Sequence, residues 1–124
     1  MKSLELIAGV DTPTIVLNKE RGVFEIAGKS LPNNPSQFYE PVMKWIKEYI
    51  AEPNPATVFS FKMKYFNTAS SKIIMEIMDK LKQLHDSGKQ LEIHWFYYSD
   101  DEEMLEAGEE YSEILEVPFV FKTM

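Results

Sequence analysis

Hydrophobic and polar residues alternate along several parts of this chain, which is the spacing of a strand with one buried face. The longest such run covers residues 57–66, where Phe59, Phe61 and Met63 are separated by Ser60 and Lys62. Shorter runs of the same kind occur on either side of it. The pattern predicts five strands, at residues 14–17, 23–27, 57–66, 91–98 and 117–122.

Three other segments place hydrophobic residues three or four positions apart, the spacing of an amphipathic helix. The first helix is expected to begin with Ser36 as its N-cap and to end before Pro53. The second is expected over about residues 70–85 and closes at Gly88, because glycine is favoured just after a helix end. The third is expected over about residues 101–115.

The order of these elements predicts an α/β fold. Residues 28–35 are rich in turn formers and are expected to form a loop. The first two strands are expected to form a hairpin, and the unit over residues 57–98 predicts two parallel strands joined by a right-handed crossover. We therefore expect one domain over residues 1–124, with a mixed sheet of about five strands and three helices.

Two predicted strands are apolar on both faces near their carboxyl ends. Tyr65 and Phe66 are neighbours at the end of one, and Phe96 and Tyr98 lie at the end of the other. This is typical of a sheet that is covered on both faces, or of a sheet that carries a surface for a partner. The sequence alone leaves both explanations open.

The charge of the chain is unevenly distributed. Its net charge is −7, yet residues 100–116 hold nine acidic residues and neither Lys nor Arg. The remaining residues hold 11 acids and 13 bases, a net charge of about +2. This distribution argues against nucleic-acid binding, which needs a basic surface. The acidic segment is either a solvated helix face or a surface for a basic partner.

Composition also restricts the chemistry and the compartment. The chain has no cysteine, which excludes disulfides and thiolate catalysis. It has no signal peptide and no apolar run near the roughly 18 residues of a membrane span, so we expect a cytoplasmic protein without direct membrane insertion. It has only two histidines, His85 and His94, and no glycine-rich phosphate loop. These features indicate neither a catalytic site, nor a metal site, nor a cofactor.

The most informative chemistry lies where the strand at residues 57–66 meets the following helix. Three hydroxyl groups, those of Thr68, Ser70 and Ser71, lie there beside Asn67. Free N–H groups and the positive end of the helix dipole favour an anion at such a junction. The junction is therefore suited to a phosphate, either bound there or attached covalently. The simpler alternative is that one hydroxyl caps the helix, which stabilises it by about 1 kcal/mol.

A phosphoryl group at this junction would also meet positive charge. Lys64 lies near the end of the preceding strand and Lys72 lies in the first turns of the helix. Either ammonium group is suited to pair with a phosphate and to hold it against the helix N-terminus.

The chain resembles the SiaC-type family of regulatory phosphoproteins. The central match is Tyr65-Phe66-Asn67-Thr68-x-Ser70, followed by an amphipathic helix, then Gly88-Lys89 and the strand end His94-Trp95-Phe96-Tyr97. Weaker matches are Thr12-Pro13, Pro32-Asn33-Asn34 and Val117-Pro118-Phe119. The resemblance spans nearly the whole chain and implies a STAS-like fold, similar to that of anti-sigma-factor antagonists.

The resemblance also implies a function. In that family a SiaB-type kinase phosphorylates a threonine at this junction, and a SiaA-type phosphatase of the PP2C class removes the phosphate. The unphosphorylated form activates a SiaD-type diguanylate cyclase, which raises cyclic di-GMP and favours biofilm. The matching threonine is Thr68, with Ser70 and Ser71 as alternative acceptors. The resemblance thus implies a non-enzymatic, partner-switching regulator whose candidate partner-binding residues are Asn67, Ser70, Lys64, Tyr65 and Lys72.

Two alternatives from other classes remain open. A ligand-binding or enzymatic domain would use the same helix N-terminus to hold a phosphorylated metabolite or a nucleotide. A constitutive scaffold would instead bind its partner through the acidic helix at residues 100–116. The scaffold would be indifferent to substitution at Thr68 and sensitive to charge reversal at Glu102, Glu106 or Glu109.

Overall fold

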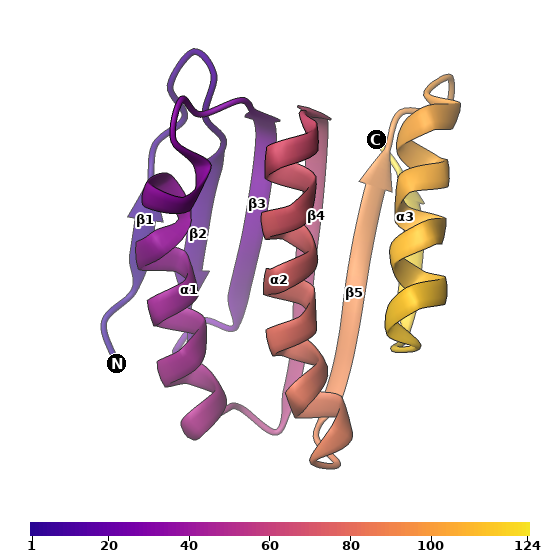
Figure 1. The fold of residues 1–124 in the computed structure, drawn as a ribbon. Coiled ribbons are helices and arrows are strands. Elements are labelled where there is room, and N and C mark those ends of the chain that lie inside the picture. The colour runs from indigo at the N-terminus through magenta and orange to yellow at the C-terminus, as the bar shows by residue number, and fades with distance from the viewer.

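The computed structural model describes residues 1–124 and contains six strands and three helices (Figure 1). The strands are β1 (Leu4–Leu6), β2 (Thr14–Asn18), β3 (Val23–Ser30), β4 (Ala56–Phe66), β5 (Gln90–Tyr97) and β6 (Phe119–Thr123). The helices are α1 (Pro35–Ala51), α2 (Thr68–Asp86) and α3 (Glu102–Leu115). The predicted α/β class is confirmed, and the predicted number of strands is one too low.

The strands lie in one sheet in the order of the chain, β1-β2-β3-β4-β5-β6. The first three are antiparallel neighbours, which confirms the predicted hairpin, and β3 to β6 are parallel. Each parallel step passes through one helix, and all three helices lie on the same face of the sheet (Figure 1). Right-handed crossovers that advance in one direction produce this arrangement. The other face carries no helix, which excludes a sheet covered on both faces, one of the two explanations that the sequence left open for the apolar strand ends.

An irregularity in β4 explains the two adjacent aromatic residues at its end. Met63 and Tyr65 pair with consecutive residues of β3, so Lys64 has no partner in the register. An extra residue of this kind reverses the alternation of the strand beyond it. Phe66 therefore packs toward Trp95, with ring centroids 6.2 Å apart, while Tyr65 is 53% exposed.

Two element boundaries differ clearly from those expected, and one strand was missed. Residues 28–30, expected as loop, continue β3, because they pair with the end of β4. Helix α1 begins one residue before Ser36, and its N-cap is Asn34, whose side chain accepts the Gln37 N–H at 3.2 Å. Strand β1 was not predicted, since its three residues are too few for their alternation to be recognised.

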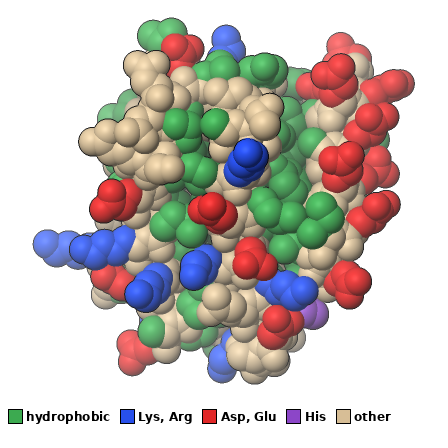
Figure 2. All heavy atoms as spheres, in the orientation of Figure 1, with side chains coloured by type: hydrophobic (Ala, Val, Ile, Leu, Met, Phe, Trp, Pro, Cys, Tyr) green, Lys and Arg blue, Asp and Glu red, His purple; other side chains and the backbone are tan.

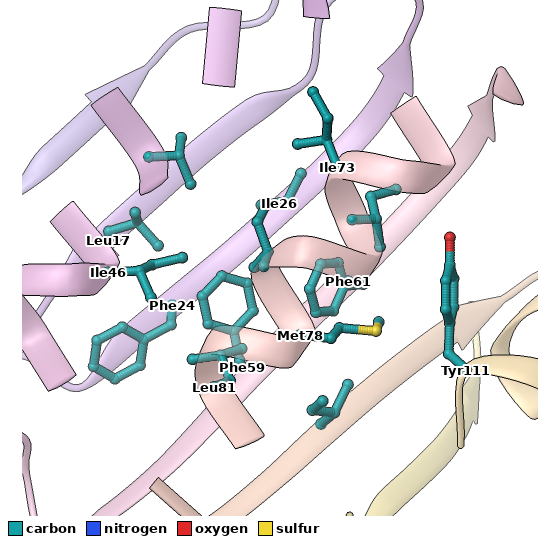
Figure 3. Packing of buried hydrophobic residues seen from close by; sticks show 14 of the residues in the cluster. Leu17, Phe24, Ile26, Ile46, Phe59, Phe61, Ile73, Met78, Leu81 and Tyr111 are labelled. Atoms are coloured by element: carbon teal, nitrogen blue, oxygen red, sulfur yellow. The ribbon is translucent and has the colours of Figure 1, made fainter. Parts of the chain in front are cut away.

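The hydrophobic core lies between the sheet and its single layer of helices. Phe24, Ile26, Phe59 and Phe61 project from neighbouring strands toward the helices, and each is at most 3% exposed. Figure 3 shows these side chains against residues of α2, with Tyr111 of α3 at the edge of the cluster. The hydrophobic residues whose alternation predicted the strands thus face this core, and the residues between them face the uncovered side of the sheet.

The carboxyl ends of the parallel strands and the start of each helix meet at one end of the molecule, which we call the carboxyl end (upper end in Figure 1). Antiparallel pairing brings the β1–β2 loop to the same end. Of the eight large hydrophobic side chains that are exposed, five lie here: Ile7, Val10, Tyr65, Tyr98 and Met124. The fold therefore places most of the exposed large hydrophobic side chains at the end of the molecule that also carries the strand–helix junction.

Candidate functional site

The junction between β4 and α2 is organised by an asparagine. The Asn67 side-chain oxygen accepts the Ser70 N–H at 2.9 Å, and the Asn67 carbonyl accepts the Ser71 N–H at 2.9 Å. Asn67 is therefore the N-cap of α2. The prediction that one of the three hydroxyls caps the helix is wrong, because Asn67 precedes them and occupies the capping position.

Thr68 is the first residue of α2 and is exposed. Its N–H and that of Ala69, which is also exposed, have no carbonyl one turn earlier within the helix. The Thr68 side chain takes no part in the cap. It therefore presents its hydroxyl to solvent beside two unpaired N–H groups and the positive end of a 19-residue helix.

Ser70 has the opposite environment, since its relative exposure is 0%. Its hydroxyl donates to the Ser30 carbonyl at 3.0 Å and accepts from the Ser30 hydroxyl at 2.9 Å. The Ser30 hydroxyl also lies 2.6 Å from the Tyr39 hydroxyl. This buried hydroxyl network joins the end of β3, the first turns of α1 and the start of α2. It fixes the position of the helix terminus that carries Thr68.

Ser71 is half-buried and its two oxygens are both engaged. Its hydroxyl donates to the Thr68 carbonyl at 2.7 Å, and its carbonyl accepts the Tyr111 hydroxyl at 2.9 Å. Of the three candidate hydroxyls, the one at Thr68 is therefore the most accessible. The contact with Tyr111 also ties the start of α2 to α3.

Burial raises the pKa of both tyrosines in these contacts. The pKa of Tyr39 lies above its ordinary value of 10.0 because the ring is desolvated, and the hydrogen bond with Ser30 opposes the shift. The pKa of Tyr111 is raised well above 10.0 by burial, with the hydrogen bond to Ser71 opposing and the charge of Glu110 adding to the shift. Both hydroxyls stay protonated at neutral pH and act as fixed donors.

A groove runs between α2 and α3 next to this junction. Two adjoining cavities of about 380 and 190 Å³ share Phe66 and Ala107 in their linings. Figure 2 shows hydrophobic side chains along this groove, with acidic side chains along its α3 side. We call it the α2–α3 groove; its lining residues include Lys64, Tyr65, Phe66, Lys72, Met75, Glu103, Ala107, Glu110 and Tyr111.

The structure thus brings the candidate residues together in two groups. Asn67 and Ser70 lie inside the junction and hold it in place. Lys64, Tyr65 and Lys72 lie in the wall of the α2–α3 groove. Another cavity, of about 610 Å³, lies at the opposite end of the sheet and includes His85, Lys89 and Glu92 in its lining.

Three contributing residues were not identified from the sequence. Ser30 lay in a segment expected to be loop, and Tyr39 and Tyr111 had no feature that separated them from ordinary core aromatics. Ser30 and Ser70 are 40 residues apart, as are Tyr111 and Ser71, and Tyr39 lies nine residues from Ser30. No local pattern reports such pairs.

The structure also bears on metal binding and on membrane spanning. No group of three or more His, Cys, Asp or Glu side chains is placed to hold a metal ion. His94 pairs instead with Glu92, at 2.8 Å between the ring nitrogen and the carboxylate. None of the helices has the length and the apolar character that a membrane span requires.

A mixed sheet with all its helices on one face defines a small α/β domain, and an exposed threonine lies at the start of its central helix. The sequence profile described as "SiaC family regulatory phosphoprotein" matches residues 7–124. The chain therefore belongs to the SiaC family, as its sequence resemblance predicted.

Similar proteins come from Pseudomonas aeruginosa. The crystal structure of apo-SiaC has 27% identity and a TM-score of 0.89, with 98% of this chain and 99% of that chain covered. SiaC in the crystal structure of the diguanylate cyclase SiaD in complex with its activator SiaC has 26% identity and a TM-score of 0.91, with the same coverage. An uncharacterized protein of that organism is 27% identical over 122 residues, or 98% of this chain and 97% of that protein.

Proposed function

We propose that this chain is a non-enzymatic partner-switching regulator that binds and activates a SiaD-type diguanylate cyclase while Thr68 is unphosphorylated. The observation that carries the proposal is the exposed Thr68 hydroxyl at the start of α2, amid the exposed apolar side chains of the carboxyl end. Similarity to the SiaC that is described as the activator of SiaD supports the choice of partner.

The proposed modification is phosphorylation of Thr68 by a SiaB-type kinase, reversed by a SiaA-type phosphatase of the PP2C class. Accessibility favours Thr68 over Ser70, whose hydroxyl is buried and bonded to Ser30. It also favours Thr68 over Ser71, whose hydroxyl is bonded within the helix. The cytoplasm is the proposed compartment, because the kinase requires ATP.

The proposed mechanism is local and electrostatic. A neutral hydroxyl lets the apolar surface at the carboxyl end dock without burying charge. A phosphate carries about two negative charges and is stabilised by the N–H groups at the start of α2 and by the dipole of that helix. Covering it with a partner would remove its water, which costs several kcal/mol if no partner group replaces that water.

The direct test is to replace Thr68 by residues that differ in charge alone. Thr68→Asp should lower affinity for the cyclase at least tenfold, about 1.4 kcal/mol, and lower its rate of cyclic di-GMP synthesis. Thr68→Asn has the same size without the charge and is the matched control; Thr68→Ala should bind like the unmodified chain. Calorimetry with the purified cyclase and a product assay give the two readouts. Equal binding by the Asp and Asn variants would contradict the mechanism.

Peptide mapping of the protein from its native cells tests the site itself. The expected result is a fraction of molecules with one phosphate, on Thr68. Phosphate on Ser71 would retain the switch and move its site, whereas an unmodified chain under all growth conditions would contradict the proposal.

A further inference from the structure

Strand β6 is one edge of the sheet, and it pairs only with β5. The Pro118 carbonyl accepts the Ile93 N–H at 2.9 Å, and the Met124 N–H donates to the Tyr97 carbonyl at 2.9 Å. Backbone N–H and C=O groups alternate in direction along a strand, so every second residue from Pro118 to Met124 bonds to β5. The residues whose backbone groups point away from β5, with no partner in the chain, are Phe119, Phe121 and Thr123.

A free edge of this kind is a template on which a strand of another chain can pair. Proteins commonly protect an edge with proline or a bulge, and β6 has no proline and no register shift against β5. The rings of Phe119 and Phe121 stack with their centroids 5.9 Å apart, and both side chains are only half-buried. An added strand would therefore gain backbone hydrogen bonds and cover apolar surface at the same time.

Helix α3 lies over this end of the sheet, in contact with β5 and β6 (Figure 1), and its side away from α2 is acidic. Glu102 and Glu109 are both exposed and seven residues apart, a spacing that returns to nearly the same side of a helix. This side lies nearly opposite to Ala107, which lines the α2–α3 groove. Leu105 and Ser112 share it and are half-buried. A strand added to β6 would therefore run below an acidic rim.

We propose that the free edge of β6 binds an extended, basic segment of a protein partner, which adds to the sheet as a further strand antiparallel to β6. The antiparallel order is chosen because its ladder is the more stable of the two. In that order, the partner residues that exchange hydrogen bonds with Phe121 have their side chains on the α3 side of the sheet. These residues are Lys or Arg, at alternate positions, because the rim formed by Glu102 and Glu109 is acidic.

Charge argues against a second copy of this chain as the occupant of the edge. Two β6 strands paired antiparallel about Phe121 would satisfy the same backbone groups. That arrangement would also place two α3 helices beside each other on one face of the joined sheet. Residues 100–116 hold nine acidic residues and neither Lys nor Arg, so the two helices would repel each other. A basic segment meets the same rim with the opposite charge.

Synthetic peptides test the edge without the natural partner. The probe is a peptide of about seven residues, enough to span β6, with Lys at alternate positions and Thr or Val between them. Affinity is measured by fluorescence anisotropy with the unmodified full chain. We expect saturable binding, which should become at least tenfold weaker when Glu replaces each Lys of the peptide. Binding should also slow amide hydrogen exchange at Phe119, Phe121 and Thr123 at least tenfold, because these N–H groups gain acceptors.

N-methylated peptides test the hydrogen bonds and the direction of the added strand. Methylation of the Lys backbone nitrogens removes the N–H groups that face β6 in an antiparallel pair, and it should weaken binding at least tenfold. Methylation of the Thr and Val nitrogens adds the same number of methyl groups on the outer side of the peptide. That matched control should change affinity less than threefold.

Variants of the chain complete the test. Thr123→Pro removes one outward N–H at an exposed residue and should weaken binding at least fivefold, whereas Thr123→Val, which keeps the N–H, should not. Glu102→Lys with Glu109→Lys should weaken binding at least tenfold. Glu106→Lys with Glu113→Lys gives the same net charge on exposed positions of α3 away from the edge, and should change affinity less than threefold. Urea denaturation confirms that each variant is folded.

Several results would overturn the proposal. They are absence of saturable binding by the Lys peptide, equal or greater loss from methylation of the Thr and Val nitrogens, and equal effects of the two double variants. Sedimentation that shows a dimer of the chain, lost in Thr123→Pro, would assign the edge to a second copy instead. The edge shares no residue with the β4–α2 junction, so failure of peptide binding leaves the proposed function untouched. Equal cyclase binding by the Thr68 variants likewise leaves the edge proposal untouched.

Discussion

Two residues in the first turn of α2 show how one short segment serves both structure and signalling. Thr68 is exposed, whereas Ser70 is fully buried. Two positions along a helix turn the side-chain direction by about 200°, so one hydroxyl faces solvent and the other faces α1 and β3. The buried hydroxyl holds the terminus that presents the exposed one.

Ser70→Ala should destabilise the protein without changing the site that is modified. The substitution removes the donor to the Ser30 carbonyl and the acceptor for the Ser30 hydroxyl, both in a buried environment. We expect a loss of about 1–3 kcal/mol in the free energy of unfolding, measured by urea denaturation. Ser71→Ala, which removes a hydroxyl bonded only within the helix, should cost less than about 0.5 kcal/mol. Equal losses would mean that the buried network does not hold the junction.

The Tyr39 hydroxyl should make stability fall at high pH. Its pKa is raised in the folded state by burial, so its contribution is complete below the ordinary value of 10.0 and is lost as pH rises toward the folded-state pKa. Above pH 10 the unfolded chain releases this proton and the folded chain does not, with a limiting slope of about 1.4 kcal/mol per pH unit.

Comparing the stability of wild type with that of Tyr39→Phe separates the contribution of the Tyr39 hydroxyl from the contributions of lysines and other tyrosines. The variant should be less stable than wild type near neutral pH, because the Ser30 hydroxyl loses a partner. The difference in the free energy of unfolding between wild type and the variant should decrease as pH rises from about 9 to 11. A constant difference across that range, from urea denaturation at each pH, would show that Tyr39 ionises equally in both states.

The sequence located this site but not its internal contacts. The strand pattern, the helix pattern and the hydroxyls between them placed the junction at residues 64–72. The identity of the cap was missed because Asn67 and the three hydroxyls all suit that position. The partners of Ser70 were missed because Ser30 is 40 residues away and approaches only when β3 and β4 pair.

At the level of elements, the packing of α3 depends on a close approach between this helix and the sheet. Gly108 lies against the Trp95 indole, and a β-carbon at this position would lie 2.4 Å from Trp95 Cδ1. The Trp95 N–H donates to the Met104 carbonyl at 2.9 Å, which fixes the same turn of α3. The glycine lowers helix propensity but permits this contact.

Gly108→Ala should therefore destabilise the protein although alanine is the better helix former. Trp95 is fully buried and has no room to move, so α3 must shift away from the sheet. We expect a loss of about 1–3 kcal/mol in the free energy of unfolding and a changed tryptophan emission. Glu109→Ala, on an exposed neighbouring position, should stay within about 0.5 kcal/mol of wild type. A gain in stability from Gly108→Ala would contradict the packing described.

Long patterned elements were predictable and short or irregular ones were not. Strand β4 and helix α2 have enough residues for their period to be clear. Strand β1 has three residues, and the irregularity at Lys64 reverses the alternation in a way that mimics a strand buried on both faces. Such features depend on register with a neighbouring strand, which the local sequence does not report.

At the scale of the whole molecule, we expect the two ends of the sheet to have different roles, partner binding at one end and structural support at the other. The carboxyl end carries five of the eight exposed large hydrophobic side chains, Thr68, and the end of the α2–α3 groove that Lys64 and Tyr65 line. The opposite end, where α1 leads into β4, is held by a buried hydrogen bond of 2.7 Å between the hydroxyls of Tyr49 and Thr57. If binding belongs to the carboxyl end, stability and affinity must respond to different substitutions.

Tyr65→Ala and Thr57→Val test this separation. Tyr65 is 53% exposed beside the groove, so its loss should leave the free energy of unfolding within about 0.5 kcal/mol and lower cyclase affinity at least tenfold. Thr57 is 2% exposed, and its valine variant should lose about 1–3 kcal/mol of stability while affinity stays within about twofold. Urea denaturation and calorimetry with the cyclase give the two quantities for each variant. If affinity instead followed stability in both variants, partner binding would depend on the stability of the whole fold and not on a surface at its carboxyl end.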